Sequence, residues 1–163
     1  MQGYVKNIEE TSRAIRNGWY TNLGDIGFWL VNPFNGKKDI YWMSRNSAIV
    51  IRGGANYACE HINQELHKFL VQVMGFDAKE TRVASVGLKV QSEHEDDCLV
   101  TIECPGKFGD KIVGEIMAKA PKFVMKGAVP SKVRFAPIPR NFKGAILVNA
   151  LKKDWLTYLK SNE

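Results

Sequence analysis

A single carboxylate near the start of the chain stands where it could bind a sugar. Residues 18–29 read Gly-Trp-Tyr-Thr-Asn-Leu-Gly-Asp-Ile-Gly-Phe-Trp, so Asp25 follows an aromatic run and a glycine. A carboxylate in this position can accept hydrogen bonds from two vicinal hydroxyls, as on a ribose, each contributing about 1.5–3 kcal/mol. A Gly-Asp step is also common in plain turns, so this segment alone leaves the turn interpretation open.

Two later segments extend the pattern. Residues 41–54 read Tyr-Trp-Met-Ser-Arg-Asn-Ser-Ala-Ile-Val-Ile-Arg-Gly-Gly, and residues 138–147 read Ile-Pro-Arg-Asn-Phe-Lys-Gly-Ala-Ile-Leu. Taken with the Gly-Asp segment, and in this order, they resemble the C-terminal part of the AMP-forming adenylate-forming ligases. That superfamily comprises acyl- and aryl-CoA synthetases, peptide-synthetase adenylation domains and luciferase. Its pattern reads Gly-Trp-Tyr-x-Thr-Gly-Asp, then Gly-Arg-x-x-Asp-x-Ile-x-x-x-Gly, then Leu-Pro-x-x-x-x-Gly-Lys.

The resemblance implies acyl adenylation followed by thioester formation. In the family, the residues matching Asp25 and Arg45 hold the ribose of ATP or acyl-AMP, and the position matching Ser47 is the hinge of a C-terminal lid. The segment Arg52-Gly53-Gly54 matches the glycine-rich loop that faces the pantetheine of CoA. A carboxylate suits hydroxyl donors, and a guanidinium supplies planar donors to oxygen acceptors. The implied ligands are ATP or AMP, with Mg accompanying ATP, together with CoA and a carboxylic acid.

The sequence departs from the family pattern where the chemistry takes place. Ala145 occupies the position of the final lysine, and losing such a preorganised donor lowers a rate by roughly 10²–10³-fold. Lys143 lies two residues earlier and, on an extended loop, would share a face with Ala145, so it is the candidate substitute. Leu23 replaces the motif threonine, and Ser47 stands where aspartate or lysine is typical. No residue is assigned as catalytic.

The chain is also short for the family, whose members are several times longer than 163 residues. Nothing in it resembles their phosphate-binding loop, so we expect it to be inactive alone and to need an ATP-binding large domain, on the same or a separate chain. Residues 1–46 are predicted to be the partial C-terminal end of the large domain's barrel subdomain. An exposed apolar face there would favour homo-oligomers. Residues 47–163 are predicted to form the lid domain.

Hydrophobic periodicity predicts an α+β fold. Strand-like runs at 28–32 and 39–43 flank an Asn-Gly step, which indicates a β-hairpin. The resemblance implies that this hairpin is a remnant of the large domain's barrel subdomain. From residue 48 the order is β-α-β-β-α-β-α, with helices at 58–73, 110–120 and from 147. The strands fall at 48–51, 81–90, 98–104 and 132–137. We expect a small three-stranded sheet packed with helices.

Composition and charge limit which partners and ligands the protein is expected to bind. The net charge of +6 favours an anionic partner, or else reflects only a solvated surface. Nucleic-acid binding is not expected, because the tryptophans lie in apolar runs rather than among lysines and arginines. Three cysteines without close spacing indicate reduced thiols and a cytoplasmic protein. No apolar run approaches about 18 residues, so no membrane span is expected. His61 and His67 fall on different helix faces, so no metal site is expected either.

Two functions remain open. One is the lid portion of an acyl-CoA synthetase-like ligase, present as a fragment, a subunit or a truncated gene product. The other is a non-catalytic nucleotide- or CoA-binding regulatory module that kept the lid fold. Ala145 favours this second function, because it stands where the family has its lysine. The acyl substrate is not specified, because the family selects it in the large domain.

Overall fold

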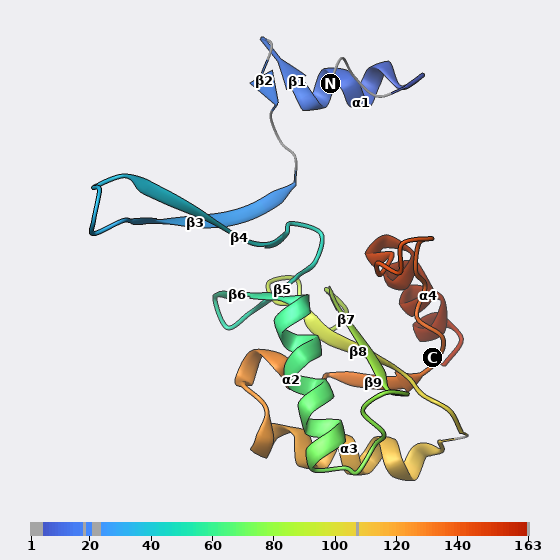
Figure 1. Cartoon of the computed structure of the whole chain (residues 1–163). Helices are drawn as coiled ribbons and strands as arrows, with labels where there is room; N and C mark the ends of the chain where they lie inside the picture. Colours follow the sequence, from blue (N-terminus) through green and yellow to red (C-terminus); the bar gives the residue numbers. More distant parts are fainter. Residues whose placement is uncertain (1–4, 18, 21–23, 107, 163) are drawn as a thin grey trace. The chain divides into compact units, whose positions relative to one another are not determined.

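The computed structural model describes residues 5–17, 19–20, 24–106 and 108–162 (Figure 1). These residues form two units, Met1–Asn46 and Ser47–Glu163. Leu23, which replaces the motif threonine, lies outside the described residues.

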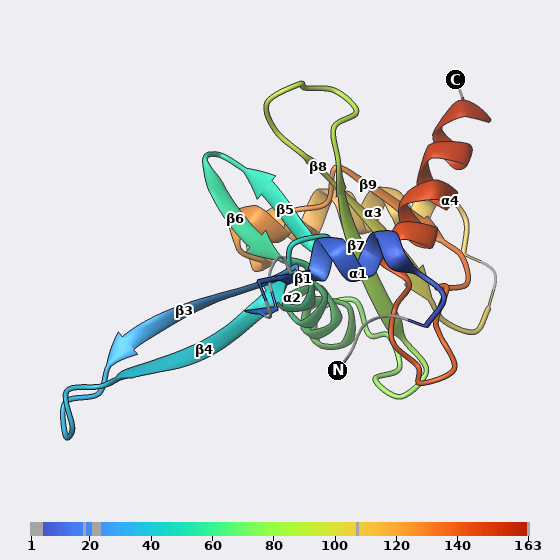
Figure 2. The ribbon, with the colours of Figure 1, turned by 90° about the horizontal axis from the view of Figure 1, so that it is seen from above.

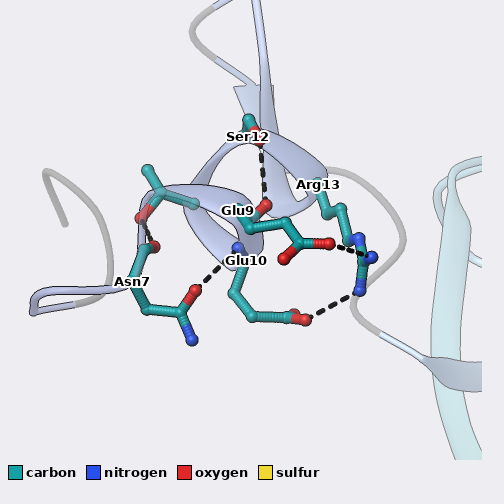
Figure 3. A network of polar contacts seen from close by, with 6 residues as sticks. Asn7, Glu9, Glu10, Ser12 and Arg13 are labelled. Atoms are coloured by element: carbon teal, nitrogen blue, oxygen red, sulfur yellow. Dashed lines mark hydrogen bonds and ion pairs between the residues drawn. The ribbon is translucent and has the colours of Figure 1, made fainter.

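The first unit begins with a short helix, α1 (Ile8–Ala14). It starts where it does because the Asn7 side chain accepts a hydrogen bond from the Glu10 amide at 3.0 Å, which satisfies a backbone donor left open at the helix start. The carboxylates of Glu9 and Glu10 both pair with Arg13 one turn later (Figure 3). Strand β1 (Ile15–Arg16) then pairs with β2 (Trp19–Tyr20).

A long hairpin completes this unit. Strand β3 (Asp25–Val31) runs antiparallel to β4 (Lys38–Arg45), so the predicted hairpin is confirmed with longer strands than expected. Its turn is held by asparagine side chains: Asn32 accepts from the Phe34 amide and Asn35 from the Lys37 amide, both at 2.9 Å. Gly36 has a φ of +67°, a backbone conformation that glycine adopts without strain, which explains why the Asn-Gly step predicted the turn.

The second unit is built on a three-stranded sheet in the order β7-β8-β9. Strand β7 (Arg82–Leu88) is antiparallel to the central β8 (Asp97–Glu103), and β9 (Lys132–Phe135) is parallel to β8. Helices α2 (Cys59–Gln72) and α3 (Asp110–Phe123) lie against one face, and α4 (Val148–Lys160) against the other (Figure 1). The predicted α+β class with a small helix-packed sheet is confirmed.

Strand β8 is buried on both faces because its side chains alternate between two cores. Val100 and Ile102 join the core with α2 and α3, whereas Leu99 joins the core with α4. On the α4 side, Trp155 is fully buried and its Nε1 donates to Thr101 Oγ1 at 3.0 Å. The polar atom of the indole ring therefore has a hydrogen-bond partner inside the core.

Strand β5 (Ile49–Arg52) does not join this sheet. It forms a separate hairpin with β6 (Ala55–Ala58), a strand that the sequence pattern did not indicate. A short helix, η1 (Lys126–Ala128), lies against Tyr57 of β6. There the ring approaches so closely that a Cβ on Gly127 would stand 2.3 Å from it. Seen from above, the connection between β7 and β8 projects as a long loop (Figure 2).

Helix α3 also differs from expectation, because it continues through Pro121 to Phe123 instead of ending at residue 120. Across the described part of the chain, none of the helices combines the length and apolarity that a bilayer crossing requires.

Candidate functional site

Asp25 and Arg45 lie opposite each other at the open end of the β3–β4 hairpin. The Arg45 Nε lies 2.8 Å from Asp25 Oδ1. Next to them, the Asn46 amide donates to the Gly24 carbonyl at 2.7 Å, where Gly24 has a φ of +75°. The structure therefore brings together the two residues that the sequence analysis assigned to ribose binding, twenty positions apart in sequence.

A β-bulge is what sets them opposite each other. The pairing is regular from the turn down to Gly27, which pairs with Trp42. The next residue, Ile26, pairs with Ser44, so the register shifts by one residue between these two pairs. Met43 is the extra residue on β4. Without this shift Asp25 would face Ser44, so the bulge decides which side chain meets the carboxylate.

Gly27 makes the bulge sterically possible. A Cβ at this position would lie 2.5 Å from the Tyr41 carbonyl oxygen, closer than any side chain tolerates. On β3, Asp25, Gly27 and Trp29 point to the same face, because side chains in a strand alternate. Trp42, opposite Gly27, belongs to that face as well. The ion pair thus shares its face with two indole rings.

The Asp25–Arg45 pair contributes little to stability. The Asp25 side chain is 39% exposed and that of Arg45 is 64% exposed, and exposed ion pairs contribute only about 0.2–1 kcal/mol. In chemical terms it presents a carboxylate that accepts from hydroxyls beside a guanidinium that donates to oxygens. Such a pair is suited to a polyhydroxylated ligand and is not required by the fold.

The hairpin around the pair exposes many apolar side chains. Phe28 and Tyr41 stack at 5.2 Å between ring centroids, yet remain about half exposed. The expected exposed apolar surface within residues 1–46 is present among the described residues, but it lies on both faces of the hairpin, because neighbouring residues of a strand point to opposite sides. Its large members on the hairpin are Phe28, Trp29, Leu30, Val31, Phe34, Ile40, Tyr41, Trp42 and Met43.

The proposed hinge and glycine-rich loop belong to the second unit. Ser47 is exposed in the turn at which the second unit begins. Gly53 and Gly54 form the turn between β5 and β6, with φ values of +59° and +74°. Arg52 does not extend into solvent there, because its guanidinium donates to the Val129 carbonyl and to Ser131 Oγ.

An acidic loop holds the glycine turn in place. Glu95 accepts a hydrogen bond from the Gly53 amide at 3.0 Å, and Asp96 accepts from the Ile51 amide at 2.9 Å. This acidic stretch connects β7 to β8. In the structure it also fastens the β5–β6 hairpin.

The last motif forms a tight turn and not the extended loop that the sequence analysis assumed for Lys143 and Ala145. Asn141 Oδ1 accepts from both the Lys143 amide at 2.9 Å and the Ala145 amide at 3.0 Å. Arg140 and Ile146 close the turn as an isolated antiparallel bridge. Both Lys143 and Ala145 are exposed on it. The premise of a shared extended face is therefore wrong, because the asparagine side chain folds the segment back on itself.

A charged pair that sequence reasoning missed anchors this turn to the sheet. Arg140 Nη1 lies 2.9 and 3.0 Å from the two carboxylate oxygens of Glu103, and Glu103 also accepts from the Ile138 amide at 2.6 Å. The arginine hydrogen bond is the main reason why the pKa of Glu103 is lowered from its ordinary value. An arginine directly after Ile138-Pro139 was the available signal, but its partner is 37 positions away.

The cysteines and histidines offer no competing site. Burial raises the pKa of Cys59 to about 11 and that of Cys98 to about 12, so neither is a ready nucleophile. His67 Nε2 lies 3.3 Å from the Ala78 carbonyl oxygen. Within the described ranges, no three His, Cys, Asp or Glu side chains gather closely enough to hold a metal ion.

Comparison with known proteins gives this arrangement its context. No protein-family profile matches the chain. The peroxisomal butyrate–CoA ligase of Arabidopsis thaliana is 32% identical over 159 residues, which cover 93% of this chain and 24% of the relative. The solved structure of McyG A-PCP complexed with phenylalanyl-adenylate matches with a TM-score of 0.69 at 22% identity, covering 99% of this chain and 27% of that one. The o-succinylbenzoate CoA synthetase of Bacillus subtilis, solved with an acyl-adenylate, matches with a TM-score of 0.60 at 20% identity, covering 93% and 28%.

Fold and sequence together define the class: the chain matches the adenylate-forming ligase superfamily, and the resemblance noted in its motifs is confirmed. Within that superfamily it corresponds to a C-terminal part, and its curated relatives are acyl-activating enzymes. The chain spans about a quarter of the length of these proteins.

Proposed function

We propose that this chain is the C-terminal lid portion, with the end of the barrel subdomain, of an AMP-forming acyl-CoA synthetase-like ligase. The observation that carries the proposal is the Asp25–Arg45 pair, an exposed carboxylate–guanidinium contact at 2.8 Å in motif positions that match the family's ribose-binding residues. Residues 1–46 would be the barrel remnant and residues 47–163 the lid, with Ser47 as the hinge between them.

The remaining roles follow the same assignment. Asp25 and Arg45 would bind the ribose of ATP or AMP, and the turn at Arg52, Gly53 and Gly54 would face CoA. Glycines with positive φ suit that role, since a backbone without Cβ lets a thin ligand pass close to it. Magnesium would arrive with ATP and be held by the large domain, as the described residues offer no cluster of metal ligands.

We propose that the chain has no activity alone and acts on a carboxylic acid only with an ATP-binding large domain. The exposed apolar hairpin supports this, because contiguous apolar surface of this kind usually marks an interface. The location is proposed to be cytoplasmic, although relatives carry the word peroxisomal in their names. A fluorescent fusion of the full chain distinguishes the two compartments.

The first experiment is titration calorimetry with AMP and with CoA. AMP should bind wild-type protein, and Asp25→Asn should weaken it by roughly 10- to 150-fold, because a hydrogen bond to a charged group contributes about 1.5–3 kcal/mol. Asp39→Asn, on the same hairpin but near its turn, is the matched control and should leave AMP affinity unchanged. Equal AMP affinity in wild type and Asp25→Asn would contradict the ribose assignment.

The second experiment tests catalysis in trans. The chain is mixed with the large domain of the Arabidopsis butyrate–CoA ligase, and pyrophosphate release is followed with butyrate and ATP. Ala145→Lys should raise the rate by roughly 10²–10³-fold over wild type, because it restores the missing cation. Ala145→Met has similar length without the charge and should not.

The alternative function is a non-catalytic nucleotide- or CoA-binding module, which Ala145 favours because that position lacks the lysine. It predicts AMP or CoA binding with no turnover in trans, with or without Ala145→Lys. Restored turnover would exclude it.

A further inference from the structure

The Gly53–Gly54 turn between β5 and β6 is fastened on one side by Arg52. The half-buried guanidinium of Arg52 donates to the Val129 carbonyl and to Ser131 Oγ. Ser131 Oγ also accepts from the amide of Cys98, which belongs to the central strand β8, at 3.2 Å. The start of the turn is therefore tied to the three-stranded sheet.

The acidic loop between β7 and β8 fastens the other side. Glu95 Oε1 accepts from the Gly53 amide at 3.0 Å. Asp96 contacts Ile51 twice, since its amide donates to the Ile51 carbonyl at 2.8 Å and its carboxylate accepts from the Ile51 amide at 2.9 Å. Asp96 can come this close because Gly87 has no side chain: a Cβ there would lie 2.7 Å from Asp96 Oδ2. The loop is thus fitted to the hairpin at three hydrogen bonds.

These contacts fix a backbone that its own residues leave free. Gly53 and Gly54 both have positive φ, as in the type I′ turns of two-residue hairpins. Glycine loses more conformational freedom on ordering than any other residue. The β5–β6 hairpin already closes through its own strand pairing, so the Glu95 contact adds order to the turn and does not form it.

One side of the turn stays open. A Cβ on Gly53 would lie 4.0 Å from Lys126 Nζ, whereas a Cβ on Gly54 would meet none of the described atoms within 4 Å. A thin ligand can therefore pass close to the backbone at Gly54.

We propose that Glu95 is a positioning residue for CoA, an inference that rests on the proposed function in which this turn faces that ligand. Glu95 holds Gly53 in one conformation, with Arg52 and Asp96 fixing the strand that leads to it. CoA then meets a turn that is already ordered, so binding does not require a further loss of glycine freedom.

Titration calorimetry with CoA on the full chain tests this role. Glu95→Ala should weaken CoA by about five- to thirtyfold, which corresponds to ordering the backbone of one residue at the moment of binding. Glu95→Gln keeps an acceptor oxygen and should stay within about threefold of wild type. Glu93→Ala is the matched control in the same loop, because the Glu93 carbonyl that accepts from Lys89 Nζ at 2.7 Å survives in alanine. AMP should bind all these proteins equally, since Asp25 and Arg45 are unchanged.

A double variant separates preorganisation from direct contact. Asparagine followed by glycine favours a type I′ turn by itself, so adding Gly53→Asn to Glu95→Ala should recover most of the lost CoA affinity. The Gly53 amide also gives a readout that needs no ligand. Its hydrogen exchange, followed by NMR, should be faster in Glu95→Ala and unchanged in Glu95→Gln and Glu93→Ala.

The outcomes distinguish this role from the function on which it rests. Wild-type protein that binds no CoA would contradict the proposed function of the turn, and the positioning role with it. If CoA binds, equal affinity in wild type and Glu95→Ala overturns the positioning role alone. An equal loss in Glu95→Ala and Glu95→Gln overturns it as well, as does a double variant that stays as weak as Glu95→Ala or a Gly53 exchange rate that Glu95→Ala leaves unchanged.

Discussion

Replacing Glu103 by glutamine tests how the last motif is held on the sheet. The Glu103 carboxylate accepts from Arg140 Nη1 at 2.9 and 3.0 Å and from the Ile138 amide at 2.6 Å. Hydrogen bonds to charged groups contribute about 1.5–3 kcal/mol, and the roughly one-third exposure of both side chains reduces this by screening. We therefore expect Glu103→Gln to lower the free energy of unfolding by about 1–2 kcal/mol at neutral pH.

The pH dependence of that difference follows from the pKa of Glu103. The Arg140 hydrogen bond lowers the pKa of the folded state below the ordinary value of 4.5, and the Ile138 amide adds to the effect while burial opposes it. Because the folded pKa is depressed, the stabilisation is fully present above the unfolded pKa and is lost as the pH falls through the folded pKa. Wild type and Glu103→Gln should therefore converge in stability at acid pH.

Urea unfolding followed by circular dichroism measures this directly, since the signal comes mainly from helices α2, α3 and α4. The comparison is made near neutral pH and again well below 4.5, with Glu93→Gln, an exposed acid in the loop between β7 and β8, as the control. A stability difference that stays constant over this range, or that Glu93→Gln reproduces, would refute the proposed anchoring role.

Three further substitutions probe the second unit. Gly127→Ala should destabilise it by about 1–3 kcal/mol, because the new Cβ would stand 2.3 Å from the Tyr57 ring; chemical denaturation measures the loss. Gly114→Ala, on α3 with no atom within 4 Å of the added Cβ, should instead stabilise by about 0.5–1 kcal/mol in the same assay. Trp155→Phe should cost about 1–3 kcal/mol, since Thr101 Oγ1 loses its 3.0 Å indole donor in the core, and calorimetry should show the corresponding fall in Tm.

Elements with strong periodicity were predictable from the sequence. The apolar stripe at helical spacing, Ala58, Ile62, Leu66, Phe69, Leu70 and Val73, predicted α2. Its four central members are buried, whereas Ala58 at the start is only half-buried and Val73 at the end is exposed. Strand β6 was not predictable, because Ala55-Asn56-Tyr57-Ala58 has no apolar alternation and forms a strand only by pairing with β5 after the glycine turn. Helix α3 continues past its predicted end only as far as Phe123. Pro121 has no amide to donate to the Met117 carbonyl, but the backbone keeps its helical path and the Val124 amide still donates to the Ala120 carbonyl.

The candidate site shows the same division. The resemblance in motif order predicted roles for Asp25 and Arg45, and the structure places these two side chains 2.8 Å apart. The anchoring of the turn around Ala145 by Glu103 was invisible, because the two partners are separated by 37 positions and meet only through the sheet.

The bulge at Met43 has a consequence for how the pairing of Asp25 with Arg45 is encoded in the sequence. If Met43 were deleted, β3 and β4 would form an unbroken ladder in which Asp25 still faces Arg45. If Met43 stayed and the strand were straightened, the arginine would move to the far side of the hairpin. The spacing of the motifs along the chain is therefore one residue longer than a regular hairpin needs. A related protein lacking that residue should present the same carboxylate and guanidinium from a smooth strand, with no glycine required at the position of Gly27.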